Sequence, residues 1–548
     1  MHEATLSSAL GPTDIPLLEE TISANLARTV AAHGDRDALV SVEQGLRYSY
    51  REFAAAVDEV AAGLMALDVQ AGDRVGIWSP NCAEWVLVQY ATARIGAILV
   101  TINPAYRVAE LEYVLNQSGI SVLVAAESFP HSDYRGMVAE AWERVPARQV
   151  VYLQTSDWED LLAGGAAVSA DRLAARSAGL RPGDAINIQY TSGTTGFPKG
   201  TTLSHRNILN NGFFVGEACG YTTADRVCIP VPFYHCFGMV LGNLACTTHG
   251  SAMVIPSAGF DAAAALRACQ KERCTSLYGV PTMFIAELGE PDLDEYDLSS
   301  LRTGIMAGSP CPVEVMKQVV DRMNMAEVTI ASGMTETSPV STQTSVDDSL
   351  DKRVSTVGRA HPHVEVRIVD PETGDTVPRG QAGEFMTRGY SVMLGYWDDE
   401  ARTAEAIDNQ GWMHTGDLAT IDDDGYINIV GRIKDMIIRG GENVYPREIE
   451  EYLYRHPDVV EVQVIGVPDA RYGEEIMAWI QLRDGAELEA DDIREFCRGQ
   501  IAHYKIPRYI KFTAEFPMTI TGKIQKYLMR KQSIEELGLG EAAQERHA

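Results

Sequence analysis

Long apolar runs, paired cysteines and positive charge are all scarce in this chain of 548 residues. Its longest apolar stretches, such as residues 95–100, are strand-sized and far below the ~20 residues of a membrane span. The nine cysteines are scattered without a CxxC pair, which favours reduced thiols in a cytosolic protein over a disulfide framework or a zinc site. Residues 1–10 have no basic segment followed by an apolar core, so we expect no secretory signal and a cytoplasmic location.

The charge balance restricts the partners of the protein. With 46 basic and 76 acidic side chains, the formal net charge is -30, which opposes binding to nucleic acids and to anionic membrane surfaces. One stretch differs, because residues 503–531 hold seven lysines and arginines against a single acid, Glu515. That stretch suits a polyanionic ligand such as ATP or CoA, although a solvated charged surface is the more usual meaning of such a run.

The order of apolar patterns predicts an α/β fold with more than one domain, since the chain is too long for one core. Strand-like runs alternate with helical patterns through the first four hundred residues, which indicates mostly parallel sheets. From residue 364, strands alternate with Gly- and Pro-rich turns, as in a small antiparallel sheet or barrel. Beyond residue 435 we expect a compact α+β unit, with helices at 446–455 and 491–502 and strands at 459–467 and 476–482.

One run, from Tyr190 to Gly200, carries the strongest functional signal. It follows a strand-like segment and combines three glycines and several hydroxyl residues with Lys199. Glycine lets backbone N–H groups approach a ligand, hydroxyls add donors, and lysine adds a charge for phosphate oxygens. The spacing is not that of a Walker loop, because Pro198 stands where the second glycine would be. The run therefore predicts a phosphate-binding loop, with a flexible surface turn as the plainer alternative.

Further motifs follow in the order of one family: Ser-Gly-Met-Thr-Glu at 332–336, Thr-Gly-Asp at 415–417, Gly-Arg-Ile-Lys-Asp at 431–435 and Thr-Gly-Lys-Ile at 521–524. With the loop at 190–200, the chain resembles the adenylate-forming (AMP-binding) superfamily, and most of all its medium- and long-chain fatty acyl-CoA synthetases. The resemblance implies a large N-terminal domain of parallel-sheet α/β subdomains with a small β-barrel-like part. It places this domain at residues 1–431, a hinge at 432–435, and a small mobile α+β lid at 436–548.

The resemblance implies a ligase that works in two half-reactions. A carboxylic acid and ATP would give an acyl-adenylate and pyrophosphate, with Mg²⁺ on the phosphate oxygens, and the thiol of CoA would then displace AMP. Catalytic roles would belong to Lys523, Thr335, Glu336 and His235, with Glu336 also the magnesium ligand. ATP or AMP would contact Thr191, Ser192, Gly193, Thr194, Thr195, Lys199, Gly308, Ser309, Pro310, Ser332, Gly333, Met334, Asp417 and Arg432. The hinge residue would be Lys434, CoA would contact Arg439, Gly440 and Gly441, and the acyl pocket would include Phe233, Tyr234, Phe237, Gly238 and Gly242.

Several of these residues also have a plainer interpretation. By composition alone, Lys523 is one more lysine in a basic tail, and a lone histidine such as His235 among apolar residues is more often part of the core. An aspartate after glycine, such as Asp417, is usually a turn residue. Ser332 departs from the family, most of whose members have an aromatic there that stacks on adenine. We therefore expect that stack to be lost or supplied elsewhere, with weaker binding of ATP.

The identity of the acid stays open at this point. Gly238 and Gly242 lie among large apolar residues, a pattern that can leave an apolar channel. Because each buried CH₂ contributes about 0.8 kcal/mol, this favours fatty acids of roughly C6 to C12. The alternatives are CoA ligation of an aryl, dicarboxylic or branched acid, the loading of a carrier protein, and a catalytically silent binding protein. No carrier motif follows residue 531, and a silent protein would not need Lys199, Glu336, Asp417 and Lys523.

Overall fold

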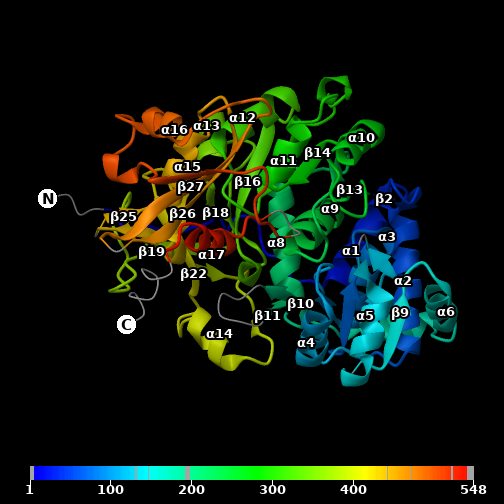
Figure 1. Ribbon diagram of the computed structural model, residues 1–548. Helices are drawn as coiled ribbons and strands as arrows, with labels where there is room; N and C mark the ends of the chain where they lie inside the picture. Colours follow the sequence, from blue (N-terminus) through cyan, green and yellow to red (C-terminus); the bar gives the residue numbers. More distant parts are fainter. Residues whose placement is uncertain are drawn as a thin grey trace.

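Two large sheets form the framework of the first four hundred residues (Figure 1). The computed structural model describes residues 5–129, 132–145, 147–191, 198–440, 442–469, 471–519 and 523–539. One sheet has seven strands in the order β21 (Gly395–Tyr396), β11 (Lys199–Ser204), β10 (Ala185–Thr191), β5 (Ile98–Thr101), β4 (Arg74–Trp78), β6 (Val122–Ala125) and β9 (Gln149–Tyr152). The other has nine, in the order β18 (Arg359–Ala360), β17 (Val340–Gln343), β16 (Glu327–Gly333), β15 (Thr303–Ala307), β14 (Ser276–Gly279), β12 (Arg226–Cys228), β13 (Ala252–Ile255), β2 (Asp37–Ser41) and β3 (Leu46–Ser49).

The inner strands of both sheets are parallel, as predicted. Parallel strands are usually covered by helices on both faces of the sheet and are therefore buried on both faces. Strand β5 has this pattern, since all four of its side chains are buried. Helices α3 (Ala83–Ile95) and α8 (His205–Ala218) lie between the sheets and contact strands of both. The outer face of the nine-stranded sheet is covered by α10 (Ala262–Glu272), α11 (Pro281–Leu288), α12 (Val313–Arg322) and α13 (Leu350–Ser355).

The remaining elements of this part are short or peripheral. The other helices are α1 (Ile22–His33), α2 (Tyr50–Ala66), α4 (Val108–Ser118), α5 (Tyr134–Ala141), α6 (Ser156–Gly165), α7 (Ala170–Ala178), α9 (Ala245–His249) and α14 (Glu400–Ala406). Strands β7 (Ser128–Phe129) and β8 (Ser132–Asp133) pair with each other. None of the helices in the described part of the chain has the length and apolarity needed to cross a bilayer.

The predicted small antiparallel sheet is present. It runs in the order β1 (Ser8–Leu10), β19 (Val364–Val369), β20 (Gly383–Gly389), β22 (Met413–Ile421) and β23 (Ile427–Arg432), with every neighbouring pair antiparallel. Its first strand comes from the N-terminus of the chain, a long-range pairing that the sequence pattern did not predict.

The C-terminal α+β unit has its own sheet and its own core. It contains β24 (Ile437–Arg439), β25 (Glu442–Val444), β26 (Val459–Asp469), β27 (Gly473–Leu482) and β28 (Tyr509–Phe512), with α15 (Pro446–Leu453), α16 (Ala490–Cys497) and α17 (Lys526–Glu536). We call this unit, residues 436–539 of the described chain, the lid. It lies at the opposite end of the molecule from α6 (Figure 1). The helix predicted at 491–502 ends earlier, at Cys497.

Candidate active site

The candidate site begins where two neighbouring parallel strands end. Strands β15 and β16 pair in parallel, with Ala307 opposite Ala331, so the residues that follow them emerge at the same edge of the sheet. These are the predicted nucleotide contacts Gly308, Ser309 and Pro310 after β15, and Ser332, Gly333 and Met334 at and after the end of β16. Ligands of open α/β sheets bind at this edge, the carboxyl end of the strands.

Lys523 reaches this edge from the lid. A Cβ atom built on Gly308 would lie 3.6 Å from Cε of Lys523, which places the lysine against the turn after β15. Burial lowers the pKa of Lys523, the Arg432 guanidinium lowers it further, and the carboxylates of Asp417 and Glu336 oppose the change. The structure thus brings together five residues that the sequence predicted for one site.

Asp417 and Arg432 form an ion pair on adjacent strands. They are register partners in β22 and β23, and Nε of Arg432 donates to Oδ1 of Asp417 at 3.1 Å. Burial raises the pKa of Asp417, while Arg432 opposes the rise. The side chain of Asp417 is 17% exposed and that of Arg432 is 55% exposed, so the pair has access to a ligand. Asp417 lies within strand β22, so the alternative interpretation of this residue as part of a turn is wrong.

Glu336 is a buried carboxylate in the short 3₁₀ turn between β16 and β17. The hydroxyl of Tyr396 donates to its Oε1 at 2.8 Å, and the N–H of Met393 donates to its backbone carbonyl at 2.9 Å. Nζ of Lys199 lies 4.9 Å from the centre of the Tyr396 ring. Tyr396 therefore links the predicted phosphate lysine to the predicted magnesium ligand. Its only signal in the sequence is an aromatic residue in a Gly-rich segment. Thr335, beside Glu336, is buried as well.

The phosphate-binding loop itself lies partly outside the described residues. Ser192, Gly193, Thr194 and Thr195 belong to that part, as does Gly441 of the predicted CoA contacts. The flanking residues Thr191 and Lys199 are register partners in the antiparallel pair β10 and β11. The strand predicted before the run is thus present, and the two ends of the loop are adjacent.

His235 precedes a buried π-helix, Phe237–Leu244, and lies near Lys523. Burial, with a smaller contribution from the Lys523 charge, lowers the pKa of His235 to about 3. The N–H of Phe237 donates to its Nδ1 at 3.2 Å. The ring is therefore neutral near pH 7 with its proton on Nε2, which can donate to a carboxylate oxygen. A π-helix often marks a functional site.

The predicted acyl segment is well packed. Phe237 stacks on Tyr278 at 5.6 Å, Tyr234 is half-buried, and Phe233 is fully buried with its ring 5.4 Å from that of Trp85.

The two glycines of this segment correct one expectation. A Cβ atom at Gly238 would lie 2.5 Å from the carbonyl oxygen of Pro232, and one at Gly242 would lie 2.9 Å from Ile229. The expectation that these glycines leave an open channel at their Cβ positions is wrong, because each allows close packing of neighbouring segments instead.

The predicted CoA contacts lie in the β24–β25 hairpin of the lid. Nε and Nη2 of Arg439 each donate to Glu475 at 2.8 Å, and the guanidinium lies 4.5 Å from the ring of Tyr472. Gly440 has a φ of +60°, which glycine adopts without strain, and a Cβ there would lie 3.1 Å from Tyr472. Arg439 and Gly440 thus contact other residues of the lid.

Most of the basic stretch at 503–531 is paired within the lid. Ion pairs join Lys505 to Glu448, Arg508 to Asp469, Lys511 to Glu536, Lys526 to Glu450, and Arg530 to Glu474. These five side chains thus pair within the lid, two of them with the buried carboxylates of Glu450 and Glu474, whereas Lys523 lies at the candidate site.

The lid touches the N-terminal domain through α15. Nη1 of Arg447 donates to the carbonyl oxygen of Ile429 in β23 at 2.9 Å. Burial raises the pKa of Glu451, while Arg447 and the N–H of Val313, the first residue of α12, oppose the rise. A carboxylate is favoured at a helix N-terminus. These contacts hold the lid in the position that places Lys523 at the site. Lys434 lies in the short 3₁₀ turn, Ile433–Asp435, between β23 and β24.

Comparisons with known proteins agree with this arrangement. The family model for AMP-binding enzymes matches residues 26–397, and the model for the AMP-binding enzyme C-terminal domain matches residues 448–523. The chain is 50% identical to YngI of Bacillus subtilis (strain 168), whose given name is that of an acyl-CoA synthetase, over 95% of this chain and 99% of that protein. It is 45% identical to the mitochondrial medium-chain acyl-CoA ligase ACSF2 of Danio rerio, over 98% of this chain and 92% of that protein.

A solved structure shows the same fold. The ATP-bound crystal structure of MatB from Rhodopseudomonas palustris superposes with a TM-score of 0.82 at 30% identity, covering 94% of this chain and 99% of that one.

Proposed function

The chain belongs to the AMP-binding enzymes and is an AMP-forming acid–thiol ligase, and from this premise we propose that its acid is a fatty acid of medium length. The observation that carries the ligase chemistry is the placement of Lys523 of the lid beside Glu336 and the Asp417–Arg432 pair. The name of the Danio rerio relative, a medium-chain acyl-CoA ligase, supports a fatty acid as the substrate.

In the first half-reaction, a carboxylate oxygen attacks the α-phosphorus of ATP, and pyrophosphate leaves. Two anions must meet, so positive charge in a partly buried site lowers the barrier. Lys523 would bridge the acid and the α-phosphate. Nε2–H of His235 would hold the carboxylate, and Asp417 would accept hydrogen bonds from the ribose hydroxyls.

Glu336 has the properties of a magnesium ligand. Its carboxylate is buried, is oriented by the Tyr396 hydroxyl, and offers the oxygen donors that Mg²⁺ prefers. When bound, Mg²⁺ would neutralise charge on the phosphate oxygens. Lys199, held near Tyr396, would add a second positive charge on the same side of the site.

In the second half-reaction, the thiol of CoA attacks the acyl carbon, AMP leaves, and the thiol proton is released. In the lid position described above, Lys523 lies against the turn at Gly308, and Arg439 is paired with Glu475 of the lid. We propose that the lid rotates about Lys434, which would remove Lys523 and bring Arg439, Gly440 and Gly441 to the thioester-forming site. Lid motions of this kind gate many enzymes.

A panel of acids tests the substrate. Pyrophosphate release would be followed with acetate, benzoate, malonate and the straight-chain acids, with and without CoA. We expect the highest kcat/KM for acids of roughly C6 to C12, because each added CH₂ contributes about 0.8 kcal/mol of burial. A maximum at acetate, benzoate or malonate would refute the fatty-acid proposal and leave the ligase class standing. Turnover with a phosphopantetheine carrier protein but not with CoA would favour the carrier-loading alternative.

A further inference from the structure

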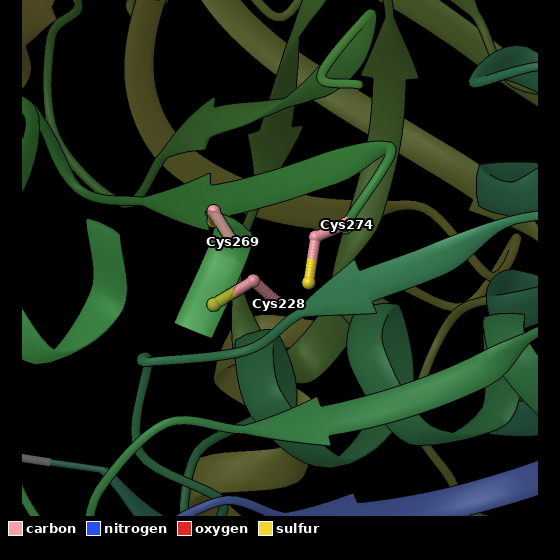
Figure 2. A group of neighbouring side chains, drawn as sticks. All are labelled: Cys228, Cys269 and Cys274. Atoms are coloured by element: carbon pink, nitrogen blue, oxygen red, sulfur yellow. The ribbon is translucent and has the colours of Figure 1, made fainter. Parts of the chain in front are cut away.

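Three buried cysteines meet in the N-terminal domain, away from the residues assigned above. Cys228 ends β12, Cys269 lies in α10, and Cys274 lies between α10 and β14. Their sulfur atoms all lie within 4.8 Å of one another, and all three residues are fully buried (Figure 2). These cysteines are separated by 41 and 5 residues in the sequence, spacings that match no metal motif and therefore did not indicate a zinc site. The fold nevertheless brings these thiols together.

Rigid elements hold the three thiols in place. The N–H of Cys274 donates to the carbonyl oxygen of Cys269 at 2.9 Å, which ties two of them through the end of α10. Strands β12 and β14 are parallel neighbours, with Cys228 opposite Leu277. The thiols of Cys228 and Cys274 contact carbonyl oxygens of α10 only at 4.0 and 3.7 Å, so these contacts are weak. Sites on helices and strands are positioned more precisely than sites on loops.

A buried carboxyl group lies close by. Helix α11 packs against α10, and its Phe284 and Leu288 belong to the same apolar cluster as the three cysteines. Between them, Glu287 is fully buried, and neither of its carboxylate oxygens has a hydrogen-bond partner in the described part of the chain. Buried polar groups are normally partnered, and a buried acid without a partner is costly. A cation held by the thiols would offset the negative charge of Glu287, whose field reaches the Cys228 thiol.

We propose that Cys228, Cys269 and Cys274 bind one thiophilic d¹⁰ metal ion, of the class of Zn²⁺ or Cu⁺. Thiolate ligands select these ions. Three sulfurs suffice for Cu⁺, whereas structural Zn²⁺ is almost always four-coordinate, so the set of three thiols favours Cu⁺ over Zn²⁺. Binding releases the thiol protons. The ion would link β12 to α10, directly before the segment that leads to His235.

Metal retention by the full-length protein tests the site. Reduced, metal-stripped protein would be incubated with Zn²⁺, or with Ag⁺ as a redox-stable substitute for Cu⁺, passed over a weak chelator, and analysed by mass spectrometry. We expect one ion per chain, and at least about tenfold weaker binding in Cys269→Ser and Cys274→Ser. The matched control is Cys246→Ser, since Cys246 is also fully buried in this domain but outside the cluster. This control should bind like wild type.

Two further measurements remain decisive if the cysteine variants fold poorly. Glu287→Gln keeps the shape of the side chain but removes its negative charge, so it should weaken the binding of either ion. Unaltered binding of both ions would show that the Glu287 charge does not act on the site. X-ray absorption of the ion retained by wild-type protein should show a shell of three sulfurs. Wild-type protein that retains neither ion, or an ion without sulfur neighbours, would show that the thiols are apolar packing groups only.

Discussion

Replacing Lys523 by alanine should separate the two half-reactions. In this lid position the lysine lies beside the carboxylates of Glu336 and Asp417 and against the turn at Gly308. Its charge would thus act where negative charge accumulates as the acid approaches ATP. In the proposed two-position scheme the lid has turned away during the thioester step, so that step should not depend on this side chain.

The expected magnitude follows from the burial of Lys523. A surface lysine contributes little because water screens its charge, whereas Lys523 is partly buried at the site, and this burial lowers its pKa. Removing an oriented charge from such a site costs about 10² to 10⁴ in rate, which corresponds to roughly 2.7 to 5.4 kcal/mol. We expect acyl-AMP formation to fall by that factor in Lys523→Ala.

The assay would measure each half-reaction separately. Acyl-AMP formation is followed by pyrophosphate release without CoA, and thioester formation is followed from supplied acyl-AMP and CoA. Lys511→Ala is the matched control, because Lys511 is a lid lysine paired with Glu536 at the surface, and both of its rates should stay near wild type. Equal losses in the two half-reactions of Lys523→Ala would refute the two-position account.

Four further expectations can be checked with the same assays. Because the pKa of Lys523 is lowered, the lysine loses its proton at a lower pH than usual, so kcat/KM for adenylation should decline on the alkaline side below pH 10.5. Lys523→Arg should move that decline to higher pH. A decline that begins only above pH 10.5 in the wild-type enzyme would contradict the placement of Lys523. Glu451→Gln removes the charge that faces Val313 and should slow adenylation by roughly threefold to tenfold without slowing the thioester step. An unchanged ratio of the two rates would show that the contact of α15 with the N-terminal domain does not stabilise this lid position. Lys434→Pro fixes φ and should preserve one half-reaction while impairing the other, and near-normal rates of both would show that the pivot lies elsewhere. Ser332→Tyr should lower the KM for ATP by roughly fivefold, in line with the 0.5–1.5 kcal/mol of an aromatic stack, and an unchanged KM would mean that adenine is not bound beside this residue.

The sequence predicted the local parts of this protein well. The strand before the phosphate-binding run, the parallel alternation and the small antiparallel sheet all depend on patterns within a few residues, and the structure has them. Asp417 and Arg432 were assigned to one site from separate motifs, and they are register partners. Short motifs retain their local geometry, so the chemistry that they carry can be read before the fold is known.

Contacts between distant segments could not be predicted in this way. Nothing in the sequence indicated that Tyr396 would bond to Glu336, because the two residues meet only when β21 joins the edge of the seven-stranded sheet. Gly242 suggested an open channel, but whether the space beside a glycine is empty depends on Ile229, which comes from another segment. The cluster around Cys228 depends likewise on the packing of α10 against the nine-stranded sheet.

A single-turnover experiment tests the central claim most directly. Enzyme in excess would be mixed with octanoate, Mg²⁺ and ATP labelled in its α-phosphate, quenched at intervals, and then chased with CoA. We expect labelled octanoyl-AMP and unlabelled pyrophosphate to accumulate first, and CoA then to convert the bound octanoyl-AMP into octanoyl-CoA and labelled AMP. Formation of labelled ADP, or of octanoyl-CoA without prior octanoyl-AMP, would contradict the central claim.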